Sequence, residues 1–195
     1  MDASKLSFLK RGRAVLATAE AELEKANSRP PPIYRFYLPP GGETDIIILD
    51  GSFDEAVGLY EHHIQDANGR WGNYVSCLRE NCSFCRIHGE SYYVIFLTIL
   101  NLQEYVKKSG EVVPFLKMLL PIKLRLLPQF LVISSSAMKK AGTLRGACVT
   151  VKRDSLFQTT WRFSKVIGEK MLIKSYGRKN VFPFKYSEVF TKWAK

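Results

Sequence analysis

The amino-acid sequence predicts a mainly β fold for most of the chain. Short runs rich in β-branched and aromatic residues recur from residue 33 to residue 167, and segments rich in glycine, proline, asparagine and aspartate separate them. No long helical crossover stands between these runs, so the strands are expected to pair with antiparallel neighbours. At 195 residues, the chain is long enough to bury one sizeable core.

The first 29 residues are expected to form a helical arm and linker ahead of the β domain. Residues 4–27 place apolar and charged positions loosely at helical spacing, and AVLATAEAELEKA has high helix propensity. The prolines at 30–32 end this pattern, because consecutive prolines favour an extended connector. We therefore assign an arm and linker to residues 1–29 and a β domain to residues 30–195.

The expected strands follow one another after the prolines. They are IYRFYL (33–38), DIIILD (45–50), AVGLYEHHI (56–64), NYVSC (73–77), YYVIFLTIL (92–100), QFLVIS (129–134), ACVTVKR (147–153) and TTWRFSKVI (159–167). One short helix is expected at SSSAMKKAG (134–142), where a serine can cap the first turn and Gly142 can end the last. This pattern favours an OB-fold, a five-stranded Greek-key barrel, here with extra strands, over a β-sandwich.

The charge balance indicates a polyanionic partner. The chain carries 29 Lys and Arg against 18 Asp and Glu, a formal charge of +11. Such a surplus favours nucleic acid or an anionic membrane, and solubility alone is the alternative. The most apolar region, 112–133, is interrupted by three prolines and three cations, so no membrane span is expected. No secretory signal is visible, and we expect a soluble intracellular protein whose cysteines bind metal more often than they form disulfides.

Three of the four cysteines lie within CLRENCSFCRIHG, residues 77–89. Cys82 and Cys85 have the Cys-x2-Cys spacing that supplies two ligands to tetrahedral Zn(II), and Cys77 is close enough to fold back onto the same ion. The fourth ligand is open among the three histidines of the chain, His62, His63 and His88. The zinc-binding part of the chain is expected to span about residues 60–90, and unmetallated thiols are the alternative.

A structural zinc is expected rather than a catalytic one. His62 and His63 point to opposite faces of a regular strand, so only one of them can reach the ion. Glu61 is the candidate general base for a catalytic site, but no H-E-x-x-H motif or deaminase motif accompanies it. Cys148 lies alone in an apolar run and is expected in the core.

Basic and aromatic residues alternate along several segments. Proteins that bind single-stranded nucleic acid combine cations along the phosphates with ring faces on which bases stack. The candidate nucleic-acid contacts are Arg35, Tyr37, Arg70, Trp71, Lys139, Lys140, Arg145, Lys152, Arg153, Trp161 and Arg162. Because side chains alternate along a strand, only about half of such aromatics can line a groove, and the rest are expected in the core.

Taken together, these segments resemble the single-stranded DNA-binding proteins of phages, related to the zinc-containing helix-destabilising protein of T-even phages. The segments that carry the resemblance are RFYLPPGGETDIIILDGSF, YEHHIQDANGRWGNYVSC, ENCSFC, YYVIFLTILNLQEY and LRGACVTVKR. The resemblance implies an OB-fold with a structural zinc whose ligands are His62, Cys77, Cys82 and Cys85.

The resemblance also implies a function. We expect a non-enzymatic protein that coats single-stranded DNA with little sequence preference during phage replication, recombination or repair, in the cytoplasm of the infected bacterial host. Self-association along the strand, with a contribution from the arm, and contacts with phage replication proteins are expected as well. The alternatives are an adaptor that zinc stabilises and a zinc-dependent nuclease or deaminase.

Overall fold

The computed structural model describes residues 15, 19–20, 33–65, 71–80, 82–106, 109–155 and 158–191, with the backbone alone described for residues 71–73 and 191. The chain divides into two units, Met1–Pro32 and Ile33–Lys195. In the first unit, Val15, Ala19 and Glu20 are helical, and the rest of the predicted arm lies outside the described residues.

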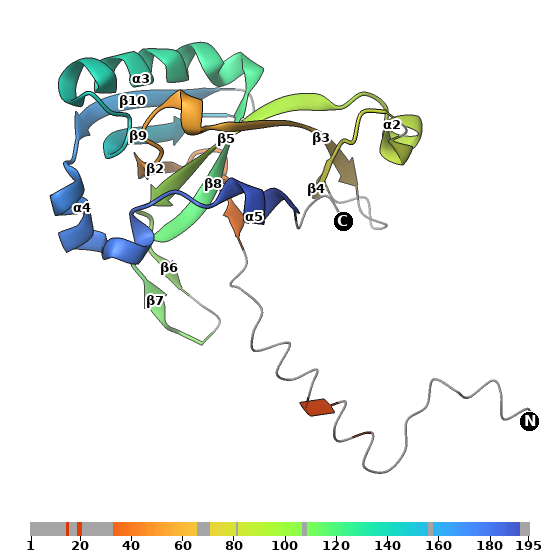
Figure 1. The fold of residues 1–195 in the computed structure, drawn as a ribbon, viewed down its shortest axis with the longest axis horizontal. Coiled ribbons are helices and arrows are strands. Elements are labelled where there is room, and N and C mark those ends of the chain that lie inside the picture. The colour runs from red at the N-terminus through yellow and green to blue at the C-terminus, as the bar shows by residue number, and fades with distance from the viewer. Residues whose placement is uncertain are drawn as a thin grey trace, which may run out of the picture. The chain divides into compact units, whose positions relative to one another are not determined.

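The second unit is mainly β, as the sequence predicts (Figure 1). Its strands are β1 (Tyr34–Arg35), β2 (Glu43–Ile48), β3 (Val57–Gln65), β4 (Trp71–Ser76), β5 (Tyr92–Asn101), β6 (Tyr105–Val106), β7 (Val112–Val113), β8 (Leu116–Lys123), β9 (Ala147–Arg153) and β10 (Thr159–Val166). Eight of them form one sheet, and β6 and β7 form a separate hairpin. The main path through the sheet is β1-β8-β5-β2-β9-β10, and β3 pairs with both β4 and β5.

Strand β5 is the centre of the sheet. Its first half pairs with β3 and its second half with β2, while β8 pairs along its length on the other edge. Residues 96–101 are all buried, because the sheet is covered on both faces at this point. The continuous apolar run YYVIFLTIL is typical of a strand buried on both faces.

The strand pairings in the described residues do not form a closed barrel. Strands β1 and β10 stand at the two ends of the path, and each pairs there with one neighbour, β8 and β9 respectively. The β1–β8 pair is parallel, and the other pairs are antiparallel. The mainly β prediction is therefore confirmed, whereas barrel closure is not seen.

Helices cover the sheet. They are α2 (Ser83–His88), α3 (Leu127–Ala141), α4 (Glu169–Tyr176) and α5 (Tyr186–Thr191), with single 3-10 turns at Phe53–Glu55, Leu124–Leu126 and Arg178–Asn180. Helix α3 lies along β10 and buries Phe130, Ile133 and Ala137 in the largest core cluster (Figure 1). Helix α5 packs on a second cluster around Phe96, and α4 packs on a third around Leu100. None of the helices in the described part of the chain combines the length and the hydrophobicity needed to cross a bilayer.

Several segments differ from the sequence prediction, which contains neither the strands β6, β7 and β8 nor the helices α2, α4 and α5. QFLVIS (129–134) is the first half of α3 and not a strand, because its buried residues recur at the helical spacing of three and four that continues into the predicted helix. Gly142 ends α3 in a left-handed conformation with φ of 67°, as expected. The sequence prediction places no strand at β8, which contains Pro121 and two lysines, and Pro121 pairs with Phe96 inside the sheet.

Candidate metal centre and adjoining groove

Strand β3, the residue after β4 and the start of α2 bring four potential metal ligands together. They are His62, Cys77, Cys82 and Cys85, whose ligand atoms all lie within 4.8 Å of one another. Cys82 is the residue before α2, and Cys85 lies in its first turn. His62 and Cys82 are buried, with exposed fractions of 1% and 6%.

The separations match a tetrahedral zinc site. The Nε2 atom of His62 lies 3.5 Å from Sγ of Cys82 and 3.4 Å from Sγ of Cys85, and the sulfurs of Cys77 and Cys85 are 3.5 Å apart. With Zn–S about 2.3 Å and Zn–N about 2.0 Å, tetrahedral coordination sets ligand atoms about 3.5–3.8 Å apart. Three thiolates and one imidazole are also a usual ligand set for structural zinc.

The thiols lie close enough to affect one another's ionisation, since the sulfurs of Cys77 and Cys85 are 3.5 Å apart. Burial opposes ionisation of Cys82, but backbone hydrogen bonds and its contact with His62 outweigh burial and lower its pKa to about 6. The neighbouring Cys77 thiol, together with burial, raises the pKa of Cys85 to about 11. The crowded sulfurs therefore cannot all ionise without a compensating cation, and a divalent metal would supply that charge.

The structure selects His62 among the three candidate histidines. His63 points to the opposite face of β3, where its ring stacks on Tyr74 with centroids 4.6 Å apart. His88 ends α2 and stacks on Phe84 at 5.9 Å. Neither belongs to the cluster in the described residues. Of the two adjacent histidines, only His62 lies in the cluster, as the alternation of side chains along a strand predicts.

Glu61 is not placed to serve a metal-bound water. It precedes His62, so its side chain leaves β3 on the opposite face, where both carboxylate oxygens accept hydrogen bonds from Arg35. Since four ligands surround the candidate site, a metal there would have no open position for a substrate. This arrangement favours a structural role for the metal.

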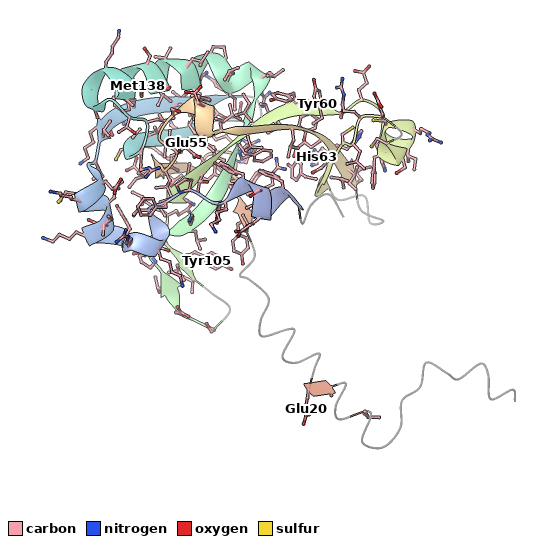
Figure 2. All side chains as sticks on the ribbon, viewed as in Figure 1. Glu20, Glu55, Tyr60, His63, Tyr105 and Met138 are labelled. Carbon is pink, nitrogen blue, oxygen red and sulfur yellow. The ribbon has the colours of Figure 1, made fainter. Side chains whose placement is uncertain are left out.

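A groove lies on the opposite face of β3 from the metal cluster. It encloses about 320 Å³, and no carboxylate is among the described residues that line it. Its cations are Arg35, Lys123, Arg125 and Arg153, and its rings are Tyr37, His63, Tyr74 and Trp161. The walls come from β1 and the segment after it, the end of β8, β9 and β10, so the groove spans the gap between the two ends of the sheet. Figure 2 labels His63 on the strand that separates the groove from the metal cluster.

Four of the predicted nucleic-acid residues line this groove: Arg35, Tyr37, Arg153 and Trp161. Tyr37 is 67% exposed, and Arg153 lies with its guanidinium carbon 5.3 Å from the centre of the Tyr37 ring. Arg153 also donates a hydrogen bond to the carbonyl oxygen of Leu38, which fixes it on the segment after β1. An exposed ring beside a held cation is the combination that base stacking and phosphate binding require.

Arg35 and Trp161 have structural contacts as well. Arg35 lies 3.7 Å from the Tyr74 ring centre while it binds Glu61, so its charge is largely compensated. Trp161 packs edge-on against Phe130 of α3, with centroids 4.6 Å apart. These two residues therefore form part of the groove walls. The packing of Trp161 agrees with the expectation that some of the aromatics that alternate with basic residues lie in the core.

The other predicted contacts lie elsewhere. Lys139 and Lys140 are at the end of α3, and Arg162 leaves β10 on the face opposite Trp161. Lys152 pairs with Asp154 at 3.0 Å. Arg145 donates to the carbonyl oxygen of Leu49, and acidic side chains of Glu55 and Glu169 lie within 3.8 Å of it. Arg70 is outside the described residues, and Trp71 is described in its backbone alone.

Sequence reasoning missed Lys123, Arg125, His63 and Tyr74 as groove residues. The pairing of His63 with Tyr74 across β3 and β4 depends on hairpin register, which the sequence alone does not fix. Lys123 ends β8, which is not among the predicted strands, and Arg125 lies in the 3-10 turn that follows it. Comparison of the chain with known protein families, curated proteins and solved structures finds no match.

Proposed function

We propose that this protein binds single-stranded DNA in the groove between the two ends of the sheet, and that it is not an enzyme. One observation carries the proposal: cations and an exposed ring line a groove in which the described part of the chain places no carboxylate. Cations attract phosphates, and ring faces stack on any unpaired base, so such a groove binds single strands with little sequence preference.

The order of the strands supports an OB-fold as the finer description. The path β8-β5-β2-β9-β10, with α3 between β8 and β9, is the order of a five-stranded OB barrel opened between its third and fifth strands. The groove occupies that opening. In this proposal, β1 and the β3–β4 hairpin are additions that form its walls.

We also propose zinc as the metal, held by His62, Cys77, Cys82 and Cys85. When bound, the ion would supply a fixed crosslink between β3 and α2. Chain residues then perform the binding: Tyr37 stacks on a base, and Arg125 and Arg153 contact phosphates. The resemblance to phage single-stranded DNA-binding proteins makes a role in phage replication, recombination or repair part of this proposal, together with self-association along the strand.

The test is a binding titration of the full chain with a labelled oligo-dT strand and a labelled duplex of equal phosphate number. We expect oligo-dT to bind more tightly, because stacking requires unpaired bases. Its affinity should fall with salt with a log–log slope of about −0.7 per phosphate contacted. Equal or tighter binding of the duplex, or an affinity independent of salt, would reject the proposal. Degradation or deamination of the labelled DNA by this protein would instead support the alternative of a zinc-dependent nuclease or deaminase.

A further inference from the structure

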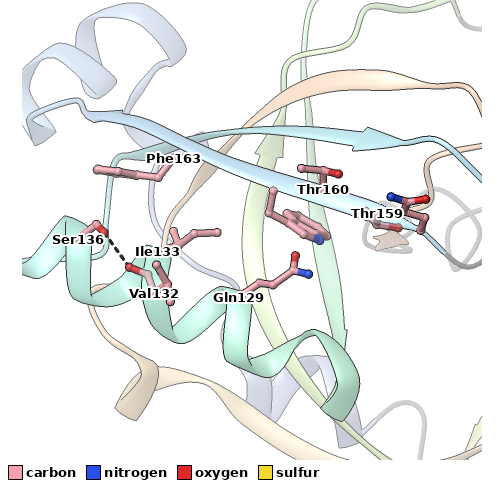
Figure 3. Close-up of a pocket in the computed structure, with 9 residues that line it drawn as sticks. Gln129, Val132, Ile133, Ser136, Thr159, Thr160 and Phe163 are labelled. Carbon is pink, nitrogen blue, oxygen red and sulfur yellow. Dashed lines mark hydrogen bonds between the residues drawn. The ribbon is translucent and has the colours of Figure 1, made fainter.

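A second groove runs between α3 and β10 (Figure 3). It encloses about 400 Å³ and shares Thr159 and Trp161 with the first groove. Helix α3 contributes four residues to its wall: Gln129, Val132, Ile133 and Ser136. Strand β10 and the residue before it contribute the opposite wall, which includes the rings of Trp161 and Phe163.

The groove has an apolar lining that is not fully explained by core packing. Ile133 and Trp161 belong to the core cluster or pack against it, but Val132 is 66% exposed. The hydroxyl of Ser136 donates to the carbonyl oxygen of Val132 at 2.8 Å, so this polar group is turned back to its own helix, and Gln129 is the other polar residue of the helix wall (Figure 3). An exposed apolar wall of this kind is typical of a binding groove.

One backbone edge of β10 lies beside the groove without a strand partner in the described residues, although near its end the carbonyl oxygen of Ser164 accepts a hydrogen bond from Nζ of Lys140 at 3.5 Å. In the described residues β10 pairs with β9 alone. An extended peptide can therefore add to this edge and place alternate side chains on the apolar floor. The helix wall from position 129 to position 140 is about 16 Å long at 1.5 Å per residue, which corresponds to about five residues of extended chain.

Cations predominate around the groove, and the one described carboxylate bonded through its backbone to a lining residue, that of Asp154 beside Gln158, is paired with Lys152 at 3.0 Å. Neither α3 nor β10 contains Asp or Glu, and none occurs from residue 112 to residue 153. At one end, Nζ of Lys140 lies 4.9 Å from the Phe163 ring centre. At the other end, Arg125 lies four residues before Gln129 and lines the adjoining groove. The groove is thus apolar in the middle and cationic at both ends.

We propose that this groove binds an extended peptide of a partner protein, with apolar side chains at alternate positions and acidic residues at both ends. A nucleic-acid strand fits less well, because the middle of the groove lacks cations and Trp161 is packed against Phe130. The two proposed sites adjoin, because Thr159 and Trp161 line both grooves, but the peptide proposal rests on the apolar wall of α3, which lines this groove and not the first.

The experiment measures binding of a fluorescein-labelled peptide, Ac-DDVTITFDD-NH2, to the full chain by fluorescence anisotropy. The control peptide is Ac-KKVTITFKK-NH2. We expect the acidic peptide alone to bind, with an affinity that falls as salt rises. Val132→Asp, which places a carboxylate on the floor, and Lys140→Glu should each weaken binding at least tenfold.

Leu131→Asp is the matched control, because Leu131 is an exposed neighbour of Val132 that does not line the groove. It should change affinity less than twofold, and thermal unfolding of all variants checks that they fold. Absence of binding by the acidic peptide, equal binding of the basic peptide, or equal effects of the Val132 and Leu131 variants would overturn the proposal. Weaker oligo-dT binding by Val132→Asp with no peptide binding would overturn it too and assign the groove to nucleic acid.

Discussion

Arg35 grips both carboxylate oxygens of Glu61 through its two terminal nitrogens, at 2.6 and 2.9 Å. Glu61 is 1% exposed and Arg35 is 15% exposed, so the pair is largely removed from water. The contact joins residues 26 apart in sequence and fixes the short strand β1 against β3. It therefore sets one wall of the groove.

Removal of Arg35 alone should strongly destabilise the fold. Arg35→Met leaves the Glu61 carboxylate buried without its cation, a change that costs about 3–5 kcal/mol. The double variant Arg35→Met/Glu61→Leu removes both charges and should be more stable than the single variant. Urea unfolding measures both. The exposed pair of Lys185 and Glu188 is the control, and Lys185→Met should cost less than about 1 kcal/mol. A double variant no more stable than Arg35→Met would contradict the role of the buried charge.

Loss of one metal ligand should abolish stoichiometric zinc. Cys82→Ser is expected to reduce zinc from one ion per chain to a small fraction, because hydroxyl is a poor substitute for thiolate. Its thermal unfolding should no longer respond to a chelator. Cys148→Ser should retain the ion, because Cys148 lies outside the cluster. Metal analysis and Co(II) absorption spectra measure the result, and equal zinc content in the two variants would exclude the proposed ligand set.

Single groove residues should affect affinity in different ways. Tyr37→Ala removes a stacking ring, and a loss of about 1–3 kcal/mol corresponds to oligo-dT binding weaker by about fivefold to about 150-fold. Arg125→Ala should also make the salt slope shallower by about 0.7. Tyr105 and Lys170 are exposed outside the groove, so Tyr105→Ala and Lys170→Ala serve as controls. Anisotropy titrations at several salt concentrations separate the two effects, and control variants as weak as the groove variants would show that the contacts lie elsewhere.

Asp50 should make stability depend on pH. Burial, assisted by Glu55, raises its pKa to about 6, although Tyr186 and the Thr98 amide donate hydrogen bonds that oppose the rise. The folded state thus holds a proton that the unfolded state releases near pH 4. The stabilisation from the protonated carboxyl is complete below about pH 4 and is lost as pH rises to about 6.

The variant Asp50→Asn removes this titration. Between pH 5 and pH 7.5, the free energy of unfolding of the wild type should fall by about 1 kcal/mol relative to that of Asp50→Asn. Urea unfolding at each pH gives the difference. Glu188→Gln, on the exposed side of the same C-terminal helix that carries Tyr186, should follow the wild type. If the free energy of unfolding of the wild type rises with pH relative to that of Asp50→Asn, the raised pKa of Asp50 is refuted.

The metal cluster was the most predictable part of the molecule. Three of its ligands lie within nine residues, and the strand alternation of His62 and His63 limits the fourth. Local spacing indicates the three cysteines, whereas the choice of His62 over His63 and His88 depends on the resemblance and on the geometry of β3. The groove depends instead on distant pairings, such as Tyr34 beside Met118, which no local pattern specifies.

The errors in the fold have physical causes. QFLVIS is rich in residues that favour strands. It is helical nevertheless, because a helix buries Phe130 and Ile133 together in the core cluster. Tertiary packing overrides propensity in this case. A proline is unfavourable in most sheet strands because it lacks an amide donor, yet Pro121 lies within β8 and pairs with Phe96.

Three consecutive residues of β3 make three different contacts. Glu61 pairs with Arg35, His62 belongs to the metal cluster, and His63 lines the first groove. A shift of this strand by one residue would exchange its faces and disrupt all three at once. A bound metal ion would therefore hold β3 in its observed register with β4. Strand β3 should tolerate conservative substitutions at its ends. A one-residue insertion or deletion near its middle should abolish both metal binding and the binding of single-stranded DNA.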